Sequence, residues 1–308
     1  MLAISRKAIR SAAMPINRRT VLAAGASILS GPTAARSEKI MTEMPFAATT
    51  PSHIGRIGIV SRDARTLADF YKGVMGLKEL RNAGGVITLG AGERPLLEIE
   101  QSAAIRPDDP RAAGLYHTAF LMPSRAELGR WIRHAVKNRV QLTGAADHLV
   151  SEALYLNDPE GNGIEIYADR DPKGWTWDGD KVRMANSALD GDGIVSSSQG
   201  LPDWTGAPDN SMIGHVHLRV GDARVAQEFW NDKIGFDTVL EYGPQAVFLS
   251  TGGYHHHIGA NSWQSRGAGP RDKDRTGLQW VELLEKGPAQ ARSFSDPWGT
   301  EIRIAPAA

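Results

Sequence analysis

An internal repeat constrains the fold of this chain more strongly than any local pattern does. Residues 54–60 match residues 213–219 at a constant offset of 159 positions. The same offset superimposes three pairs of residues that mark a helix: Asp63 on Asp222, Phe70 on Phe229 and Gly76 on Gly235. Each copy predicts a strand, a helix that begins after an aspartate cap and ends at a glycine, and further strands. Because repeats fix architecture, we expect an α+β fold of related units.

A second kind of opening marks two more units. Residues 114–120 and 277–283 both begin with Gly-Leu and are typical of first strands. The former leads to a helix over 125–138 and then to a hairpin. Between Leu284 and Asp296 there is too little chain for a helix and two strands. The sequence therefore predicts four units, of which the fourth is truncated to its first strand and its last hairpin.

The hairpin over 152–167 carries a carboxylate in mid-strand. Its turn at 158–161 contains a proline, which lacks an N–H, and a glycine, which tolerates positive φ. In the second arm, Glu165 alternates with Ile164 and Ile166 and so faces the opposite side of the strand. Such a carboxylate faces either solvent or an interior that holds a cation, and the residues alone leave both interpretations open.

Composition narrows the classes of partner. The chain has 308 residues, and its 35 Lys+Arg balance its 35 Asp+Glu, so no basic surface for nucleic acid is expected. Small molecules are then the default partners. The chain has no cysteine, which excludes disulfides and thiolate metal sites and leaves His, Asp and Glu as metal ligands.

The first 36 residues have the layout of an export signal. A basic leader without acidic residues precedes a short apolar run, and the paired Arg18 and Arg19 resemble a twin-arginine signal. The run is too short to span a bilayer, so we expect a periplasmic or exported protein without a stable membrane span. The alternative is a start of translation at Met41 or Met44, which would give a cytoplasmic protein.

Four further segments are expected after the signal. A polar spacer covers 37–52, the first pair of units covers 53–170, and the second pair, with its truncated last unit, covers 212–308. A linker rich in Asp, Gly and Ser covers 171–211. We expect three of its tryptophans to pin the linker to the fold: Trp175, Trp177 and Trp204.

Three strings resemble a known superfamily. They are His-Thr-Ala-Phe at 117–120, Asp-Pro-Glu-Gly-Asn-Gly-Ile-Glu-Ile-Tyr at 158–167, and Gly-Gly-Tyr-His-His-His-Ile-Gly at 252–259. Together with the unit order they are similar to the vicinal-oxygen-chelate superfamily of glyoxalases, bleomycin-resistance proteins and extradiol dioxygenases, most of all to Bacillus-type catechol 2,3-dioxygenases. The resemblance covers about 53–305. It implies paired βαβββ units, each pair curling into a half-closed barrel that can hold a metal.

In extradiol enzymes of this kind, Fe(II), or alternatively Mn(II), is held by two histidines and one glutamate, with positions left for a catecholate and O2. The resemblance places two of these ligands on His117 and Glu165. The position of the third ligand falls on Arg56 or on His215. Arg56 is permanently cationic and cannot bind a cation. We therefore prefer a pairing of the second unit with the third, which completes the set His117, His215 and Glu165.

The fourth unit is then expected to pair with the first and to hold no metal. Its ligand positions carry Trp280 and Arg303, and Trp280 should belong to the core. Glu98, on the last strand of the first unit, occupies a place that glyoxalase-like members use for metal. His217 shares a face with His215, so we expect it only to line the cavity.

The resemblance also implies catalytic residues. Tyr155, ten residues before Glu165, is expected to hydrogen-bond a substrate oxygen. His148 is the nearest match, two residues displaced, to a family histidine that precedes this tyrosine. His256 aligns with the acid–base histidine of the family. The alternative for the run 255–257 is a solvated strand end.

The function expected on these grounds is extradiol ring cleavage of an aromatic diol by O2, and the sequence leaves room for a homo-oligomer. Two alternatives remain open. A glyoxalase-type lyase or isomerase would use the same region, typically with four protein ligands. A non-catalytic binding module of the same fold is favoured slightly by the truncated fourth unit.

Overall fold

The computed structural model describes residues 44–288 and 290–307. The export signal expected over 1–36, and residues 37–43 of the expected spacer, lie outside the described residues. In the part of the chain that is described, the longest helices fall short of the length and apolarity that a membrane crossing requires.

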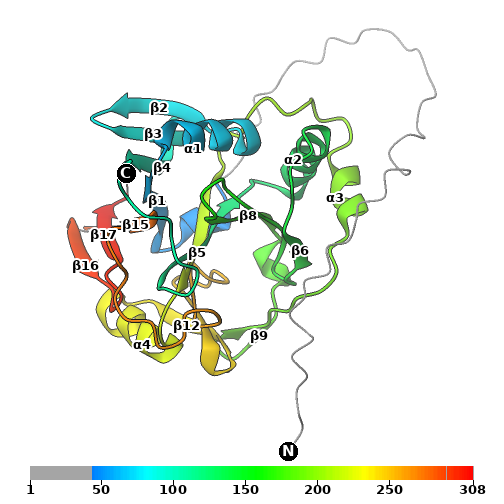
Figure 1. Cartoon of the computed structure of the whole chain (residues 1–308). Coiled ribbons are helices and arrows are strands. Elements are labelled where there is room, and N and C mark those ends of the chain that lie inside the picture. The colour runs from blue at the N-terminus through cyan, green and yellow to red at the C-terminus, as the bar shows by residue number, and fades with distance from the viewer. Residues whose placement is uncertain (1–43, 289, 308) are drawn as a thin grey trace, which may run out of the picture. The chain divides into compact units, whose positions relative to one another are not determined.

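Within the described residues, the strands form a seven-stranded sheet, an eight-stranded sheet and a two-stranded ribbon (Figure 1). The order in the seven-stranded sheet is β16 (Arg292–Ser295), β17 (Glu301–Pro306), β15 (Gly277–Glu285), β1 (Ser52–Ser61), β4 (Arg94–Gln101), β3 (Val86–Ala91) and β2 (Lys78–Ala83). The order in the eight-stranded sheet is β12 (Asp237–Tyr242), β13 (Ala246–Ser250), β14 (Ile258–Asn261), β11 (Met212–Arg219), β5 (Gly114–Leu121), β8 (Gly163–Asp169), β7 (Ser151–Asn157) and β6 (Gly144–Asp147). The ribbon pairs β9 (Trp177–Asp178) with β10 (Lys181–Val182).

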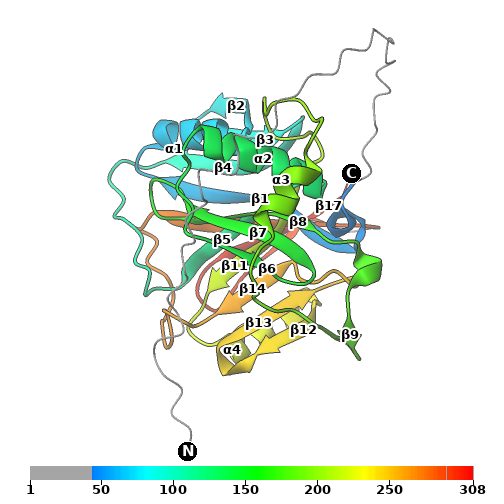
Figure 2. The same ribbon diagram turned by 90° about the vertical axis from the view of Figure 1, so that its right-hand side faces the viewer.

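The helices are short and lie on the sheets. The α-helices are α1 (Ala64–Phe70), α2 (Arg125–Lys137), α3 (Gly191–Ser197) and α4 (Ala223–Phe229). In the described part of the chain there are also two π-helical turns and three 3-10 turns: η2 (Tyr71–Met75), η4 (Trp230–Ile234), η1 (Phe46–Thr49), η3 (Pro172–Gly174) and η5 (Gly243–Gln245). Helix α1 packs on β3 and β4, whereas α4 packs on β13 and β14 (Figure 2). The fold is thus α+β, as the sequence predicted.

The units pair out of chain order. Strand β1 of the first unit runs antiparallel to β15 of the fourth, and β5 of the second runs antiparallel to β11 of the third. This confirms the preferred pairing of the second unit with the third and the expected pairing of the fourth with the first. Each sheet therefore takes one unit from 53–170 and one from 212–308, rather than two successive units.

The repeat is visible in the helix boundaries. Asp63 accepts a hydrogen bond from the N–H of Thr66 (3.0 Å), and Asp222 caps α4 in the same way. Gly76 and Gly235 end the two π-helical turns with φ of 71° and 85°. Glycine adopts this left-handed backbone without steric cost, which explains why both copies have it there.

The fourth unit is truncated as predicted. It consists of β15 and the hairpin of β16 and β17, and no helix separates them among the described residues. Asp296 organises the hairpin turn, since its carboxylate accepts from the N–H groups of Trp298 (2.9 Å) and Thr300 (2.7 Å). Asp158 has the same role in the second unit. The two sheets thus end in equivalent turns.

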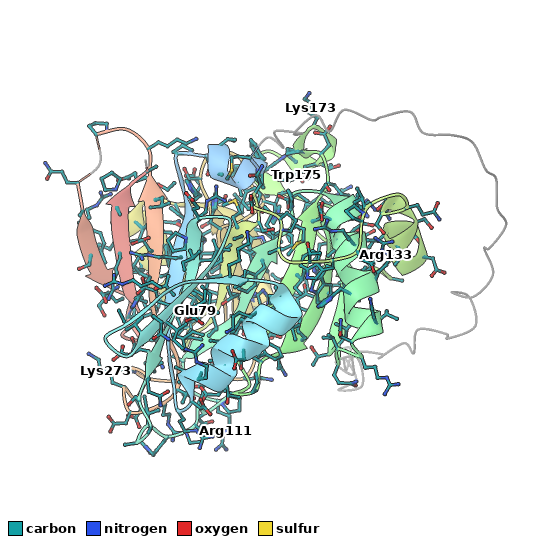
Figure 3. The ribbon with its side chains drawn as sticks, turned by 90° about the horizontal axis from the view of Figure 1, so that it is seen from above. Glu79, Arg111, Arg133, Lys173, Trp175 and Lys273 are labelled. Atoms are coloured by element: carbon teal, nitrogen blue, oxygen red, sulfur yellow. The ribbon has the colours of Figure 1, made fainter. Side chains whose placement is uncertain are left out.

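The segment expected as a linker over 171–211 carries structure of its own, namely β9, β10 and α3. Trp175 is buried, and Trp204 lies under the guanidinium of Arg130, 5.2 Å from its ring centre. Trp177 is half-buried and packs against the core cluster that contains Trp175. Figure 3 shows Lys173 projecting outward, whereas Trp175, two residues on, belongs to the buried residues. All three tryptophans therefore pack on the fold, as expected.

Part of the expected polar spacer also belongs to the fold. Phe46 packs edge-on against Trp175, with ring centres 5.8 Å apart. The hydroxyl of Thr50 lies 3.2 Å from Nε2 of His257 in the interior of the eight-stranded sheet. Residues 44–50 are therefore a structural element and not a spacer. The apolar side chains of this short stretch show no periodic pattern from which their packing could be predicted.

Candidate metal centre

Three neighbouring strands of the eight-stranded sheet bring His117, Glu165 and His215 together. The central strand, β5, is hydrogen-bonded to β8 on one side and to β11 on the other. In register, Ala119 of β5 is the partner of both Glu165 and His215. Residues 117 and 119 share a face because side chains alternate along a strand. The methyl group of Ala119, which is fully buried, leaves room between the two larger side chains.

The donor atoms of these three side chains face one another. Nε2 of His117 lies 3.0 Å from Oε2 of Glu165, and Nε2 of His215 lies 3.2 Å from the same oxygen. The two Nε2 atoms are 3.4 Å apart. Among the described residues, this is the group of His, Asp and Glu whose ligand atoms all lie within 4.8 Å of one another.

These distances fit a single metal ion. Three donors each about 2.1 Å from one ion, at right angles, lie about 3 Å from each other. Two histidines and one carboxylate on one face of a site are the ligands that suit a non-haem ferrous ion and leave other positions open. The residues present thus fit the metal that the sequence predicted, although the geometry does not select Fe(II) over another divalent ion.

The protonation states also suit metal binding. Burial lowers the pKa of His215 to about 4, although Glu165 partly opposes this shift. Burial alone would raise the pKa of Glu165, but the adjacent rings of His215 and His117 outweigh it and hold that pKa well below its ordinary value. Near neutral pH the site therefore offers a neutral imidazole and an ionised carboxylate, which are the forms that bind a metal.

Tyr155 and His148 lie together beside this group. Nδ1 of His148 is 3.0 Å from the carbonyl oxygen of Ala185, so it carries the proton and donates. Nε2 is then an acceptor, and the hydroxyl of Tyr155 donates to it at 2.6 Å. Tyr155 is the cross-strand partner of Glu165. The structure thus brings His148, the displaced match, into contact with Tyr155.

His256 lies on the other side of the group. Its ring centre is 4.1 Å from that of His215, and its side chain is buried. Burial, followed by the neighbouring His215 and His255, lowers the pKa of His256 well below its ordinary value. The alternative of a solvated strand end is wrong, because all three histidines of the run are buried: His255, His256 and His257.

The comparisons with known proteins bear on this site. A sequence profile of the Glyoxalase/Bleomycin resistance protein/Dioxygenase superfamily matches residues 53–166. A Bacillus subtilis (strain 168) protein named catechol-2,3-dioxygenase is 41% identical over 239 residues, which span 76% of this chain and 82% of that protein. The chain belongs to this superfamily.

Two solved structures share the fold at low sequence identity. A candidate dioxygenase from Bacillus subtilis subsp. subtilis str. 168 has a TM-score of 0.55 and 14% identity, with coverage of 83% of this chain and 85% of that one. Glyoxalase I from Zea mays has a TM-score of 0.51 and 13% identity, with coverage of 84% and 94%. The mixed sheets with few helices are consistent with the vicinal-oxygen-chelate fold of the superfamily.

In the seven-stranded sheet, ionic and aromatic side chains occupy the positions that correspond to the metal ligands of the eight-stranded sheet. The guanidinium of Arg56 contacts Glu98 (2.5 Å) and Glu282 (2.9 Å). Trp280 is buried, and the guanidinium of Arg303 lies 4.2 Å from its ring centre. Glu98, which glyoxalase-like superfamily members would use for metal, is thus paired with a fixed cation. Trp280 belongs to the interior, as predicted.

His217 lines the eight-stranded sheet next to the group. Its ring meets that of His117 edge-on, with centres 4.9 Å apart. The amide of Asn261 donates to its Nε2 at 3.0 Å, so this nitrogen is already engaged. The expected role of His217 as a lining residue agrees with this contact.

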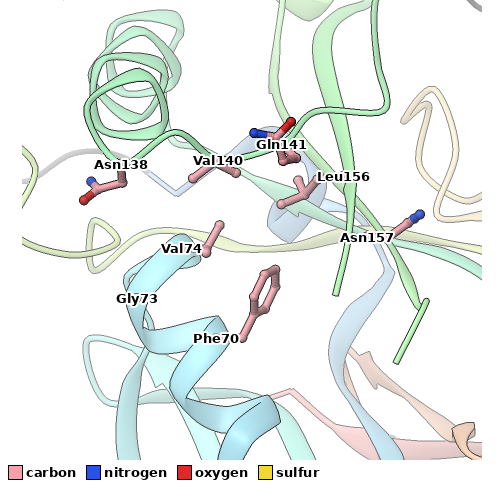
Figure 4. Close-up of a pocket in the computed structure, with 8 residues that line it drawn as sticks. All are labelled: Phe70, Gly73, Val74, Asn138, Val140, Gln141, Leu156 and Asn157. Atoms are coloured by element: carbon pink, nitrogen blue, oxygen red, sulfur yellow. The ribbon is translucent and has the colours of Figure 1, made fainter. Parts of the chain in front are cut away.

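Two surface hollows lie elsewhere on the molecule, and the three candidate ligands line neither. One, of about 410 Å³, is formed where α1 and η2 face the segment after α2 (Figure 4). Its lining is mixed, with Phe70, Val74, Val140 and Leu156 beside Asn138, Gln141 and Asn157. The other borders Lys181 and the turn at Gly235.

Sequence reasoning missed two residues of this region, Asp169 and His255. Nε2 of His255 lies 2.8 Å from Oδ1 of Asp169, and its Nδ1 lies 2.8 Å from Nδ1 of His256. The period-2 alternation of β8 could have found Asp169, because residues 165, 167 and 169 share a face. Nothing in the sequence distinguishes His255 from its two neighbours.

Proposed function

We propose that this protein is an extradiol ring-cleaving dioxygenase, which opens a catechol-type aromatic diol with O2. His117, His215 and Glu165 would hold Fe(II), or alternatively Mn(II). The observation that carries the proposal is the buried set of two histidines and one carboxylate whose donor atoms lie 3.0–3.4 Å apart. The relative named catechol-2,3-dioxygenase, at 41% identity, supports the same reaction class.

A bound ferrous ion supplies redox chemistry and open positions for a bidentate diol. The chain's own residues then bind and orient the diol. The hydroxyl of Tyr155 donates a hydrogen bond to His148, so the lone pairs of the Tyr155 oxygen are free to accept one from a diol hydroxyl. Such a diol would lie beside Glu165, the cross-strand partner of Tyr155. Tyr155 and His148 would thus fix one hydroxyl oxygen of the bound diol relative to the three metal ligands.

His256 would act as the general acid and base that transfers a proton of the diol. Its neutral ring, packed against His215, can accept a proton from a diol hydroxyl and return it to the ring-opened product. General acid or base catalysis of this kind contributes about 10²–10⁴-fold to a rate. The buried position and the surrounding histidines keep the ring neutral, which is the form that has a lone pair to accept a proton.

The test is reconstitution of the purified full chain with Fe(II) under anaerobic conditions, followed by catechol and air. We expect the yellow colour of a ring-opened product and consumption of O2. Turnover of a glutathione hemithioacetal without O2 consumption would instead indicate a glyoxalase-type isomerase. Binding of catechol without turnover of either substrate would indicate a binding module.

We also propose export by the leader at 1–36, on the strength of its paired Arg18 and Arg19. Fractionation of cells that express the full chain should place it outside the cytoplasm. Replacement of both arginines by lysine should retain it inside. A cytoplasmic location of the unchanged chain would favour a start at Met41 or Met44.

A further inference from the structure

We infer that Asp169 and His255 are positioning residues that fix the tautomer of His256. They keep the proton of its ring on Nδ1, so that Nε2 is a free acceptor. The assignment of the tautomer rests on the contacts of these three residues. The use of Nε2 for a substrate hydroxyl rests, in addition, on the proposed function.

The argument starts at the carboxylate. An ionised carboxylate only accepts hydrogen bonds, so the 2.8 Å contact between Oδ1 of Asp169 and Nε2 of His255 requires the proton on that nitrogen. Asp169 ends β8 on the face that also carries Glu165. His255 is fully buried, and the side chain of Asp169 at the end of the strand is only 12% exposed.

The proton on His255 decides the state of His256. A neutral imidazole has one N–H, so with the proton on Nε2 the Nδ1 nitrogen of His255 has a lone pair. The 2.8 Å contact between the two Nδ1 atoms then requires a proton on Nδ1 of His256. As a result, Nε2 of His256 is unprotonated. Among the described residues, that nitrogen has no protein donor or acceptor within hydrogen-bond distance.

The ring of His255 is held so that it cannot easily turn. Tyr254 stacks on it with ring centres 4.1 Å apart, and Trp175 meets it edge-on at 5.1 Å. The carboxylate of Asp169 also receives a longer contact of 3.4 Å from the hydroxyl of Tyr254. The series of hydrogen bonds from Asp169 through His255 to His256 thus has one arrangement of the rings. The carboxylate of Asp169 determines which nitrogen of each ring carries the proton.

The opposite arrangement is chemically distinct. If His255 carried two protons, Nδ1 of His256 would accept, and its Nε2 would carry the proton and donate. Such a ring could not accept a proton from a diol. Carboxylates commonly fix the tautomer of histidines at metal sites, where the loss of such a carboxylate typically costs about 10–100-fold in metal affinity or activity.

The test is long-range proton–nitrogen NMR of the imidazole rings in the ¹⁵N-histidine-labelled full chain, both metal-free and loaded with Zn(II). Signals of His256 are assigned from a His256→Gln sample. We expect Nδ1 protonated and Nε2 unprotonated. In Asp169→Asn and Asp169→Leu this preference should be reversed or lost. Asp171→Asn is the matched control, because that exposed aspartate only caps η3 and asparagine caps equally well.

Two outcomes would overturn the inference. One is a protonated Nε2 on His256 in the unchanged protein. The other is a tautomer that stays the same in both Asp169 variants. In the Fe(II) protein, Asp169→Asn should lower kcat on catechol about 10–100-fold while KM stays near its original value. If the unchanged protein cleaves no catechol but the NMR result holds, the proposed function fails and the tautomer assignment stands.

Discussion

Glycines make room for large side chains around the candidate metal centre. A Cβ on Gly214, the residue before His215, would lie 1.8 Å from the hydroxyl oxygen of Tyr167. A Cβ on Gly259 would lie 2.8 Å from the ring of His217. Real Cβ atoms do not approach other atoms so closely. Gly214 therefore leaves room for the ring of Tyr167, and Gly259 leaves room for the ring of His217.

Removal of one side chain beside the centre should separate chemistry from metal binding. His256→Ala deletes a ring that packs on His215 and leaves all three ligands in place. We expect the iron content to stay near that of the unchanged protein and turnover of catechol to fall about 10²–10⁴-fold. Metal analysis and steady-state kinetics on the same sample measure both. Unchanged turnover on every catechol tried would make His256 structural.

A buried histidine away from the ligands should give the protein a pH-dependent stability. Burial lowers the pKa of His257 to about 3, against about 6.5 in an unfolded chain. The unfolded state therefore takes up a proton first as pH falls, and stability present above pH ~6.5 is lost toward pH ~3. At pH ~5 the loss is about 2 kcal/mol from this residue.

The His257→Gln variant tests this assignment. The two ring nitrogens of His257 contact Thr50 (3.2 Å) and Ser250 (3.1 Å), and glutamine keeps a polar side chain there without the titration. Urea unfolding at pH ~7.5 and pH ~5 should show a smaller drop for the variant, by about 2 kcal/mol. Equal drops in the two proteins would mean that His257 does not titrate in this range.

At the scale of the elements, the turn between β7 and β8 fixes the strand that carries Glu165. Asp158 is buried and accepts from the N–H groups of Glu160 and Asn162, each at 2.9 Å. Its second oxygen receives the hydroxyl of Tyr71 at 3.1 Å. Tyr71 belongs to the first unit, so one carboxylate joins this hairpin to a helix of the neighbouring sheet.

Asp158→Ala should therefore destabilise the fold. Two buried N–H groups and a hydroxyl would lose their acceptor, which costs about 2–3 kcal/mol in the free energy of unfolding. Urea denaturation at neutral pH measures the change. Asp69→Ala, at an exposed helix position where the carboxylate pairs with Lys72, is the control and should change stability by less than about 0.5 kcal/mol. Equal effects of the two variants would contradict this account of the turn.

The sequence predicted long, strongly patterned elements and missed the short ones. The repeat located β1 and β11 because capped helices follow both, and the helix over 125–138 was found to within a residue. Strands β9 and β10 have two residues each, too few for any period to be visible. The contact of Asp169 with His255 joins residues far apart in sequence, and no local pattern encodes such a pair.

At the scale of the whole molecule, the two sheets share a plan but differ in what fills the place of the metal. The guanidinium of Arg56 lies between Glu98 and Glu282, so a protein cation takes the role that a metal ion would have. Sequence reasoning excluded Arg56 as a ligand on chemical grounds. It could not predict the two partners, which come from different ends of the chain.

Replacement of this cation should affect stability but not the metal content. Arg56→Met would leave two partly buried carboxylates without a partner, which we expect to cost about 1–3 kcal/mol in the free energy of unfolding. Chemical denaturation and metal analysis of the same samples measure both quantities. The unchanged protein should bind one ion per chain. A second ion per chain that is lost in Glu98→Gln would contradict the account.

The most direct test compares one carboxylate in each sheet. Glu165→Gln and Glu98→Gln make the same chemical change at the last strand of the second and the first unit. After anaerobic loading with Fe(II), we predict that Glu165→Gln retains little iron and forms no ring-opened product from catechol and O2. Glu98→Gln should retain both iron and activity. Full iron binding and turnover in Glu165→Gln would contradict the claim that His117, His215 and Glu165 form the working centre.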